Sequence, residues 1–261
     1  MGEPQTIVPF RAPAKPLGRK AYGSIPHLPG SRLGPGDWRL NDGQARILLE
    51  QPRPGDRIIA TAKLDGACVG VARCGEELIP LIRAGYRASD GDHEQLRLFD
   101  VWARREATRF DFLRPGERIM GEWLAQACGT LYDAAAPGFA PFVAFDLFRF
   151  EAGPKGRLDD RRVLRDEFAE RCARAGMPTA ALLADGPDPA PVAGMMRLLG
   201  LGRHGEVDIP EGVVWRVERE DRVDFLAKFV RADKVDGSYL PEVSGRPAIW
   251  NWRPDGGGKG K

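Results

Sequence analysis

The stretch RIIATAKLDGACVGVAR, residues 57–73, combines two runs of β-favouring residues with a tight turn between them. The runs RIIATAK and ACVGVAR are typical of strands, and Leu-Asp-Gly separates them. Because Asp-Gly is a common turn dipeptide, the stretch predicts two neighbouring strands that meet at this turn. Lys63 is the last residue of the first strand. In a hairpin such a lysine is an ordinary solvated side chain, so its meaning depends on the rest of the chain.

The composition is that of a globular protein. The 261 residues are 43% hydrophobic and 29% charged, which suits one large domain or one domain with a small appendage. No apolar run approaches the roughly 20 residues that span a bilayer. The opening segment, MGEPQTIVPFRAPAKPLGRK, also lacks the apolar stretch of a secretory signal. We therefore expect a cytoplasmic protein without a membrane partner, and the oligomeric state stays open.

Charge and cysteine content limit the kinds of site that are expected. The 39 basic and 37 acidic residues give a net charge of +2, which alone does not indicate nucleic-acid binding. Arginine dominates the basic residues, and its forked donors suit phosphate. The four cysteines form no CxxC pair, which favours free thiols in a reducing compartment over a zinc site or disulfide: Cys68, Cys74, Cys128 and Cys172.

Strands and helices are interspersed along the chain. Besides the two strands above, apolar runs predict strands over residues 78–83, 118–124, 141–150, 212–217 and 223–230. Helical periodicity predicts helices over residues 92–112, 160–175 and 190–200. We expect Asp159 or Asp160 to cap the second helix and Gly176 to end it. The fold class is therefore α+β, with largely antiparallel sheets flanked by helices.

The ends of the chain differ in composition from its middle. Residues 1–50 predict an N-terminal arm and a loop-rich platform, because residues 23–44 are dense in Gly, Pro, Asp and Asn. Residues 51–235 form the expected main domain. Residues 236–261 form the expected C-terminal tail, which ends in the disorder-favouring DGGGKGK.

Six short motifs follow one another in the main domain, each placing a polar residue inside or at the end of a strand-like run. They are Lys63-Leu64-Asp65-Gly66, Arg83-Ala84-Gly85, Gly121-Glu122-Trp123, Phe145-Asp146, Glu211-Gly212 and Lys228. A half-buried polar side chain at such a position can face a cleft. Over residues 57–231 this ordered series resembles the motifs of the covalent nucleotidyltransferase superfamily of ligases and capping enzymes. Within it, the series is most similar to ATP-dependent RNA ligases of the RNA ligase 2 type.

The resemblance implies a fold and an activity. The fold is a nucleotidyltransferase (ATP-grasp-like ligase) core of antiparallel sheets without an OB domain, so residues 51–235 would be the adenylyltransferase domain. The activity is ATP-dependent joining of 5′-phosphate and 3′-OH ends of RNA, with Mg²⁺ or Mn²⁺ as the metal. A lysyl-AMP forms first, AMP then moves to the 5′-phosphate, and the 3′-OH finally displaces AMP.

Lys63 is the nucleophile that this chemistry requires. Its amine would attack the α-phosphorus of ATP and form a phosphoramidate. An ammonium has no free lone pair, so the amine must first lose its proton. We expect burial, together with the positive charges of Lys228 and a bound metal, to lower the pKa of Lys63.

The resemblance also implies roles for the other motif residues. Asp65 acts at the nucleotide and end-sealing steps, Gly66 permits close backbone approach, and Lys228 neutralises the α-phosphate. The nucleotide contacts are Arg83 to nucleotide and 5′-phosphate, Glu122 to the ribose, Phe145 stacked on adenine and Asp146 supporting the pocket. Glu211 is the residue associated with the metal, since Mg²⁺ favours a few carboxylates, waters and phosphates.

Two features depart from the family pattern. The last motif often carries two lysines separated by one residue, but Leu226 and Val230 stand at those distances from Lys228. Arg231 or Lys234 is a candidate substitute. The loop residues His27 and Arg32 are also unexplained by the motifs, and we expect the platform to help hold nucleic acid. The list of expected nucleic-acid contacts is Arg32, Arg83 and Arg231.

Other functions stay open at this point. Within the superfamily the alternatives are a DNA ligase or a capping-type guanylyltransferase, although both normally carry an OB domain. A catalytically inactive nucleic-acid-binding module of the same fold is the alternative from another class. P-loop and Rossmann enzymes are disfavoured because their glycine-rich fingerprints are missing. The sequence does not separate nicked duplex from single-stranded or broken structured RNA, and it chooses RNA over DNA only through the resemblance.

Overall fold

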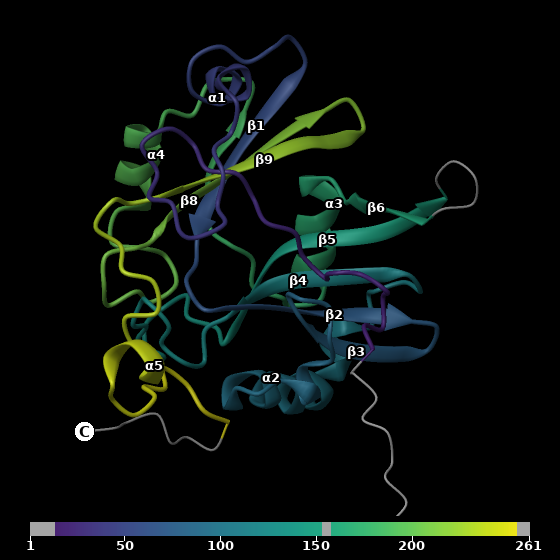
Figure 1. Ribbon diagram of the computed structural model, residues 1–261. Coiled ribbons are helices and arrows are strands. Elements are labelled where there is room, and N and C mark those ends of the chain that lie inside the picture. Colours follow the sequence, from purple (N-terminus) through teal and green to yellow (C-terminus); the bar gives the residue numbers. More distant parts are fainter. Residues whose placement is uncertain (1–13, 153–157, 255–261) are drawn as a thin grey trace, which may run out of the picture.

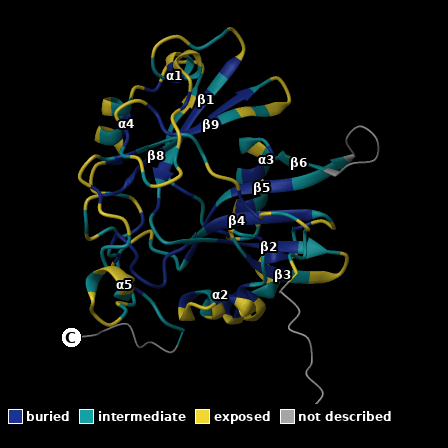
Figure 2. Cartoon of the chain, in the orientation of Figure 1, coloured by how far each residue is buried: buried dark blue, intermediate teal, exposed yellow. Residues whose placement is uncertain are grey.

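A computed structural model of the chain describes residues 14–152 and 158–254. The described residues form two antiparallel β-sheets with helices on their outward faces (Figure 1). This arrangement confirms the expected α+β class. Figure 2 shows that buried residues concentrate in the central strands, whereas exposed residues gather on helices and loops.

The first sheet has four strands in the order β7-β1-β8-β9. Their bounds are β1 Asp56–Lys63, β7 Leu182–Gly186, β8 Gly212–Arg219 and β9 Arg222–Val230. Two helices cover its outer face, α1 (Asp42–Leu49) and α4 (Val192–Leu199), and pack with it into one apolar cluster around the fully buried Trp215.

The second sheet has five strands in the order β3-β2-β4-β5-β6. Their bounds are β2 Ala67–Cys74, β3 Glu77–Ile82, β4 Glu117–Trp123, β5 Phe142–Ala152 and β6 Leu158–Arg162. Its outer face packs against α2 (Glu94–Arg105) and α3 (Arg165–Arg174). The cluster is aromatic, and Phe99 of α2 lies 5.4 Å from the Trp123 ring and 5.7 Å from the Phe142 ring, centroid to centroid.

A cleft runs between the inner faces of the two sheets. Because side chains alternate along a strand, β1 divides its residues between the outer core and the cleft. The outer set is Ile58, Ala60 and Ala62. The residues of β1 that point into the cleft are Ile59, Thr61 and Lys63, although Ala62 also reaches its wall. The strand therefore aims Lys63 into the cleft by the same alternation that buries its apolar neighbours.

A register shift in β5 places two consecutive residues in the cleft. Gly121 of β4 pairs with Ala144 and Met120 pairs with Asp146, so Phe145 is an extra residue between them. Such a bulge re-aims side chains that a regular strand would send to opposite faces. Phe145 and Asp146 consequently both line the cleft.

The seven predicted strands are confirmed within two residues, but several other elements were not foreseen. β7 and α1 fall in segments that were predicted to lack regular structure or were left unassigned. The expected cap at Asp159 or Asp160 is wrong, because both residues belong to β6 and α3 starts only at Arg165. The alternation of β6 is hidden in a run of charged residues, LDDRR, that also suits the first turn of a helix.

Part of the segment expected to be a tail packs on the main domain. It forms the short helix α5 (Pro241–Ser244), and Trp250 and Trp252 contact the aromatic core of the second sheet. Asn251 is 5% exposed and donates to the Leu124 carbonyl at 2.8 Å. The DGGGKGK end and the first 13 residues of the expected arm lie outside the described residues.

Within the part of the chain that the structure describes, no helix is both long and apolar enough to cross a bilayer.

Truncation of Phe99 tests the aromatic core. Phe99 is fully buried, so Phe99→Ala leaves a cavity among Trp102, Trp123 and Phe142. We expect a loss of about 3–5 kcal/mol in the free energy of unfolding, measured by urea titration. Val101→Ala is the matched control, since Val101 lies on the same helix and is 60% exposed. A loss below about 1 kcal/mol for Phe99→Ala, comparable to that expected of a surface substitution, would contradict this account of the core.

Candidate active site

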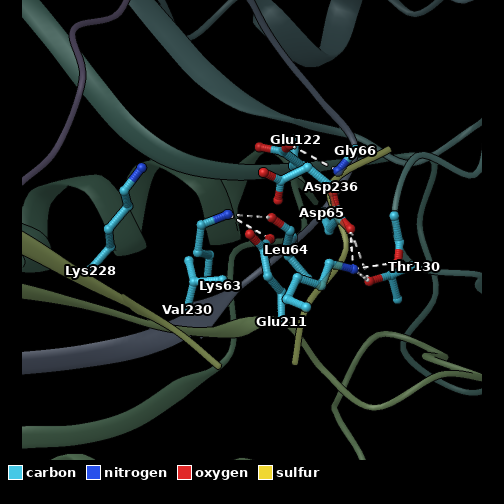
Figure 3. Close-up of polar contacts among 12 residues, drawn as sticks. Lys63, Leu64, Asp65, Gly66, Glu122, Thr130, Glu211, Lys228, Val230 and Asp236 are labelled. Atoms are coloured by element: carbon cyan, nitrogen blue, oxygen red, sulfur yellow. Dashed lines mark hydrogen bonds and ion pairs between the residues drawn. The ribbon is translucent and has the colours of Figure 1, made fainter. Parts of the chain in front are cut away.

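Lys63 lies among carboxylates at one end of the cleft (Figure 3). Its Nζ donates to Glu211 Oε2 at 2.5 Å. Glu211 precedes β8 and is 7% exposed, whereas Glu122 comes from β4 in the facing sheet. The turn after Lys63 is fixed to that second sheet, because Gly66 N donates to Glu122 Oε1 at 3.0 Å. The two sheets thus meet around the amine.

Gly66 is required by the close approach of the two sheets. A Cβ at this position would lie 2.3 Å from the carbonyl oxygen of Trp123, which real side chains do not tolerate. Glycine was expected here to let the backbone approach a ligand. In the structure it lets the turn approach the neighbouring strand, which brings Glu122 within reach of the turn.

The expected lowering of the Lys63 pKa is wrong for the charges that the described residues themselves supply. Burial does lower the pKa of this amine, but the negative charges of Glu211, Glu122 and Asp65 together outweigh burial and hold the pKa above its ordinary value. Lys228 was expected to supply an opposing positive charge, and the two lysines do disfavour each other's charge, but the carboxylates beside Lys63 outweigh this repulsion (Figure 3). These carboxylates therefore favour the ammonium form of Lys63.

Burial acts on the carboxylates in the opposite direction, because it raises their pKa values instead of lowering them. Burial raises the pKa of Glu122 to about 7, against the charge of Lys63 and the hydrogen bond from Gly66. Burial also raises the pKa of Glu211, although its ion pair with Lys63 opposes the shift. Both groups therefore bind protons more readily than exposed glutamates do.

Asp65 faces away from the cleft that Lys63 lines. Its Oδ2 contacts Lys234 Nζ at 2.5 Å and accepts a hydrogen bond from Thr130 Oγ1 at 3.0 Å. Lys234 is 2% exposed and also donates to the Gly129 carbonyl. As a substitute for the missing motif lysine, Lys234 is thus poorly placed, because its amine holds Asp65 instead of lining the nucleotide cleft.

Lys228 lines the cleft two residues along the sheet from Lys63. It pairs in register with Val214, which pairs with Thr61. Its Nζ lies 3.4 Å from Asp37 Oδ1. Burial and the charge of Lys63 both lower the pKa of Lys228, whereas Asp37 opposes the shift.

The predicted platform supplies Asp37 and packs against β9. Lys228 N donates to the Pro26 carbonyl at 2.9 Å, and Leu28 N donates to the Lys228 carbonyl at 2.8 Å. His27 is 1% exposed, with Nε2 3.0 Å from Asp37 Oδ2. His27 is therefore an internal residue of the platform and offers no surface to nucleic acid.

Aromatic and ionic groups surround the other end of the cleft. Phe145 lines the cleft and meets Tyr22 edge-on, with ring centroids 5.1 Å apart. Asp146 is 1% exposed and accepts hydrogen bonds from Tyr22 Oη at 2.7 Å and Arg162 Nε at 3.1 Å. It also pairs with Arg216 of the first sheet. This network supports the pocket wall beside Phe145 and ties the two sheets together.

The three arginines expected at nucleic acid occupy different surroundings. Arg83 lines the cleft and donates to Ser24 Oγ at 2.8 Å. Arg32 pairs with Asp236 at 2.6 Å, and Arg231 pairs with Asp233 at 2.5 Å. Arg32 and Arg231 both lie near the end of β9, since Arg32 N donates to the Val230 carbonyl at 3.0 Å. Arg83, by contrast, is a residue of the cleft.

Several cleft residues had not been singled out from the sequence. They are Tyr22, Thr61, Arg165 and Arg216, together with Asp37, which pairs with the cleft residue Lys228. Strand alternation could have found Thr61 and Arg216, because they share the faces of Lys63 and Val214. Tyr22 and Asp37 lie in a segment without periodicity, so only the tertiary structure reveals them.

Comparison with protein families agrees with this geometry. The family model described as RNA ligase matches residues 56–230, which is more than half of the chain and includes every motif from Lys63 to Lys228. The chain belongs to the RNA ligase family. No curated protein matches it.

RNA ligases are among the solved structures that the chain matches. An archaeal ATP-dependent RNA ligase is 19% identical with a TM-score of 0.46, and the match covers 80% of this chain and 48% of that chain. A variant of the Naegleria gruberi RNA ligase with ATP and Mn is 15% identical with a TM-score of 0.48, covering 85% and 61%. The same ligase with PPi is 16% identical with a TM-score of 0.47, covering 85% and 62%. This RNA ligase family member thus spans less than two thirds of each of them.

The raised pKa of Glu122 predicts a pH dependence of stability. The folded protein holds the Glu122 proton up to a pKa of about 7, whereas the ordinary value is 4.5. The folded state therefore binds more protons between these values, and this contribution to the free energy of unfolding falls as pH rises through that window. We expect wild type to lose stability relative to Glu122→Gln as pH rises from about 4.5 to about 7, measured by urea titration.

Glu76→Gln is the matched control, because Glu76 is exposed in the β2–β3 turn. Its stability difference from wild type should not change over the same pH range. If Glu122→Gln follows the same flat course, the Glu122 carboxyl is ionised in the folded protein and the account of its burial fails.

Proposed function

We propose that this chain is an ATP-dependent RNA ligase that joins 5′-phosphate and 3′-OH ends through a lysyl-AMP on Lys63. The observation that carries the proposal is the position of this amine, which points into an interior cleft between Glu211 and Glu122 at one end of an aromatic-walled slot. Membership in the RNA ligase family supports it. Binding alone would not require a lysine nucleophile in that place.

Adenylylation requires Lys63 to change its protonation state. Glu211 pairs with the amine and favours its ammonium form. Neutralisation of the surrounding carboxylates on nucleotide binding removes the charges that raise its pKa, so burial then favours release of one proton to solvent and leaves a neutral amine. The neutral amine attacks the α-phosphorus, the bond to pyrophosphate breaks, and the proton that the new phosphoramidate nitrogen gives up leaves with pyrophosphate.

A divalent cation fits the acidic surroundings of Lys63. Among the described residues, no group of three or more His, Cys, Asp or Glu side chains forms a complete metal cage. Mg²⁺ does not need one, since it keeps several waters and takes one or two carboxylates together with substrate phosphates. Glu211 is the carboxylate we assign to this ion, Mg²⁺ or Mn²⁺, and a bound cation supplies charge neutralisation at the phosphates.

The remaining cleft residues divide the nucleotide between them. Glu122 is placed for the ribose hydroxyls, and Phe145 offers its ring to the base, with Asp146 supporting the wall behind it. Lys228 and Arg83 bring positive charge to the cleft for the phosphates. Asp65 serves the later sealing step from the opposite side of Lys63, where Lys234 and Thr130 hold it.

Covalent labelling tests the proposed intermediate. We expect purified protein incubated with α-labelled ATP and Mg²⁺ to carry label after denaturing electrophoresis, and Lys63→Ala to carry none. Added pyrophosphate should remove the label, because it reverses the first step. Sealing of nicked RNA duplexes is then compared with sealing of nicked DNA duplexes.

The controls separate the proposal from its alternatives. Label from GTP instead of ATP would indicate a capping-type enzyme, and sealing of DNA alone would indicate a DNA ligase. AMP-free wild type that takes no label from either nucleotide would overturn the ligase mechanism and favour a binding module.

Arg32 tests the platform as a binding surface for RNA. If Arg32 contacts a phosphate, Arg32→Ala should weaken RNA binding at all sequences and reduce the slope of log affinity against log salt by about 1, as measured by fluorescence anisotropy. Asp236→Ala is the matched control, because it removes the ion-pair partner of Arg32 and leaves the guanidinium. Unchanged affinity and ligation in Arg32→Ala would remove the platform from RNA binding.

A further inference from the structure

The end of the cleft opposite Lys63 is built from a single row of residues across the first sheet. Lys63 pairs with Gly212, and four residues earlier Ile59 pairs with Arg216, which pairs with Leu226. Ile59, Arg216 and Leu226 all line the cleft. At a rise of about 3.3 Å per residue, this row lies roughly 13 Å from Lys63 along the sheet. That separation suits the far edge of a nucleoside monophosphate whose phosphate is at Lys63.

Arg216 is held by protein groups at this end. It pairs with Asp146, donates to the Val163 carbonyl at 3.0 Å and contacts Glu218 Oε1 at 3.3 Å. Both of its terminal nitrogens thus bind the cleft wall.

Arg165 is the neighbouring arginine and is not engaged in this way. It is the first residue of α3, its backbone N donates to Glu218 Oε1 at 2.6 Å, and its side chain lines the cleft. Its guanidinium makes no hydrogen bond or ion pair with any residue that the structure describes, and its centre lies 5.5 Å from the Phe168 ring. By contrast, Arg57 and Arg162 nearby are both paired with aspartates.

An unpaired guanidinium in this place favours a ligand acceptor. Burial and the positive charge of Arg216 lower the pKa of Arg165, whereas the charges of Asp185 and Glu218 oppose the shift without a hydrogen bond or ion pair to the guanidinium. Arginine stays protonated in proteins and carries only donors. A partly buried donor without a partner is costly, so a ligand that brings an acceptor gains affinity there.

The position of Phe145 indicates which part of the nucleotide reaches Arg165. Phe145 and Val214 line the same cleft as Lys63 and Arg165, and Phe145 adjoins Asp146, the partner of Arg216. A base stacked on Phe145 turns one edge toward the Arg165 end. Purines carry ring nitrogens that accept hydrogen bonds on those edges.

We propose that Arg165 is a base-recognition residue, whose guanidinium donates a hydrogen bond to a ring nitrogen of the purine. This inference rests on the proposed function, because it assumes that AMP lies with its phosphate at Lys63. It extends the proposed function by naming a residue that recognises the purine base of the nucleotide.

The test measures equilibrium binding, so that it does not depend on covalent chemistry. Calorimetry compares AMP, 1-deaza-AMP and 7-deaza-AMP on Lys63→Ala and on Lys63→Ala/Arg165→Met. Methionine keeps an apolar stem over Phe168 and removes the donors. We expect the double variant to bind AMP about 10- to 100-fold more weakly, the size of one hydrogen bond to a charged group. The analogue that lacks the contacted ring nitrogen should bind Lys63→Ala about 10- to 100-fold more weakly than AMP does. Its affinity should not fall further on the double variant.

The controls make the outcome decisive. Arg174→Met is the matched variant, since Arg174 lies at the exposed end of the same helix, and it should leave AMP binding unchanged. If thermal unfolding shows that Arg165→Met is not folded, Arg165→Lys takes its place. This variant retains the charge with fewer donors and should show an intermediate loss of AMP affinity. Equal affinities for all three nucleotides on Lys63→Ala, or a loss that is the same for AMP and both analogues, would overturn the inference.

Two further results separate this inference from the proposed function. If Arg165→Met weakens binding of ATP but not of AMP, the guanidinium contacts the leaving phosphates and base recognition is wrong. By contrast, if wild type takes no label from ATP, the ligase mechanism is wrong. The calorimetric comparison of AMP and its analogues still decides the role of Arg165.

Discussion

The positive charge on Lys63 is compensated by carboxylates from both sides of the cleft. Burial alone would drive this amine to lose its proton, but Glu211, Glu122 and Asp65 reverse that tendency. Glu211 belongs to the first sheet's side of the cleft and Glu122 to the second. The same contacts therefore favour the protonated form of the amine. In the proposed reaction, the charges of the nucleotide and metal alter the balance among these four groups.

The opposite end of the cleft is held by a second set of charges. Asp146 accepts from Tyr22 and Arg162 on its own side and pairs with Arg216 across the cleft. Asp146 is almost completely buried, so removal of any one partner would leave a desolvated charge. The Asp146–Arg216 ion pair thus joins the sheets at this end, and the hydrogen bond from Gly66 to Glu122 joins them at the Lys63 end.

Much of this arrangement could be predicted from local sequence, and the rest could not. The strands that carry Lys63, Glu122 and Lys228 have clear apolar runs, so their faces follow from alternation. The bulge that aims Phe145 leaves no such signal, because it depends on how β5 pairs with β4. The direction of the Lys63 pKa shift was also predicted wrongly, because it depends on contacts between residues far apart in the sequence. Glu211 is 148 residues away in the chain, and its 2.5 Å contact exists only in the folded protein.

The N-terminal segment shows why the site extends beyond the motifs. Residues 26–32 pair with β9, an edge strand whose free backbone groups would otherwise be exposed. This pairing brings Asp37 to Lys228 and buries His27 beneath them. Burial and the charge of Lys228 lower the pKa of His27, so the ring is neutral and Asp37 is left to compensate the lysine. A phosphate that binds Lys228 must compete with Asp37, so the segment sets how readily Lys228 becomes available.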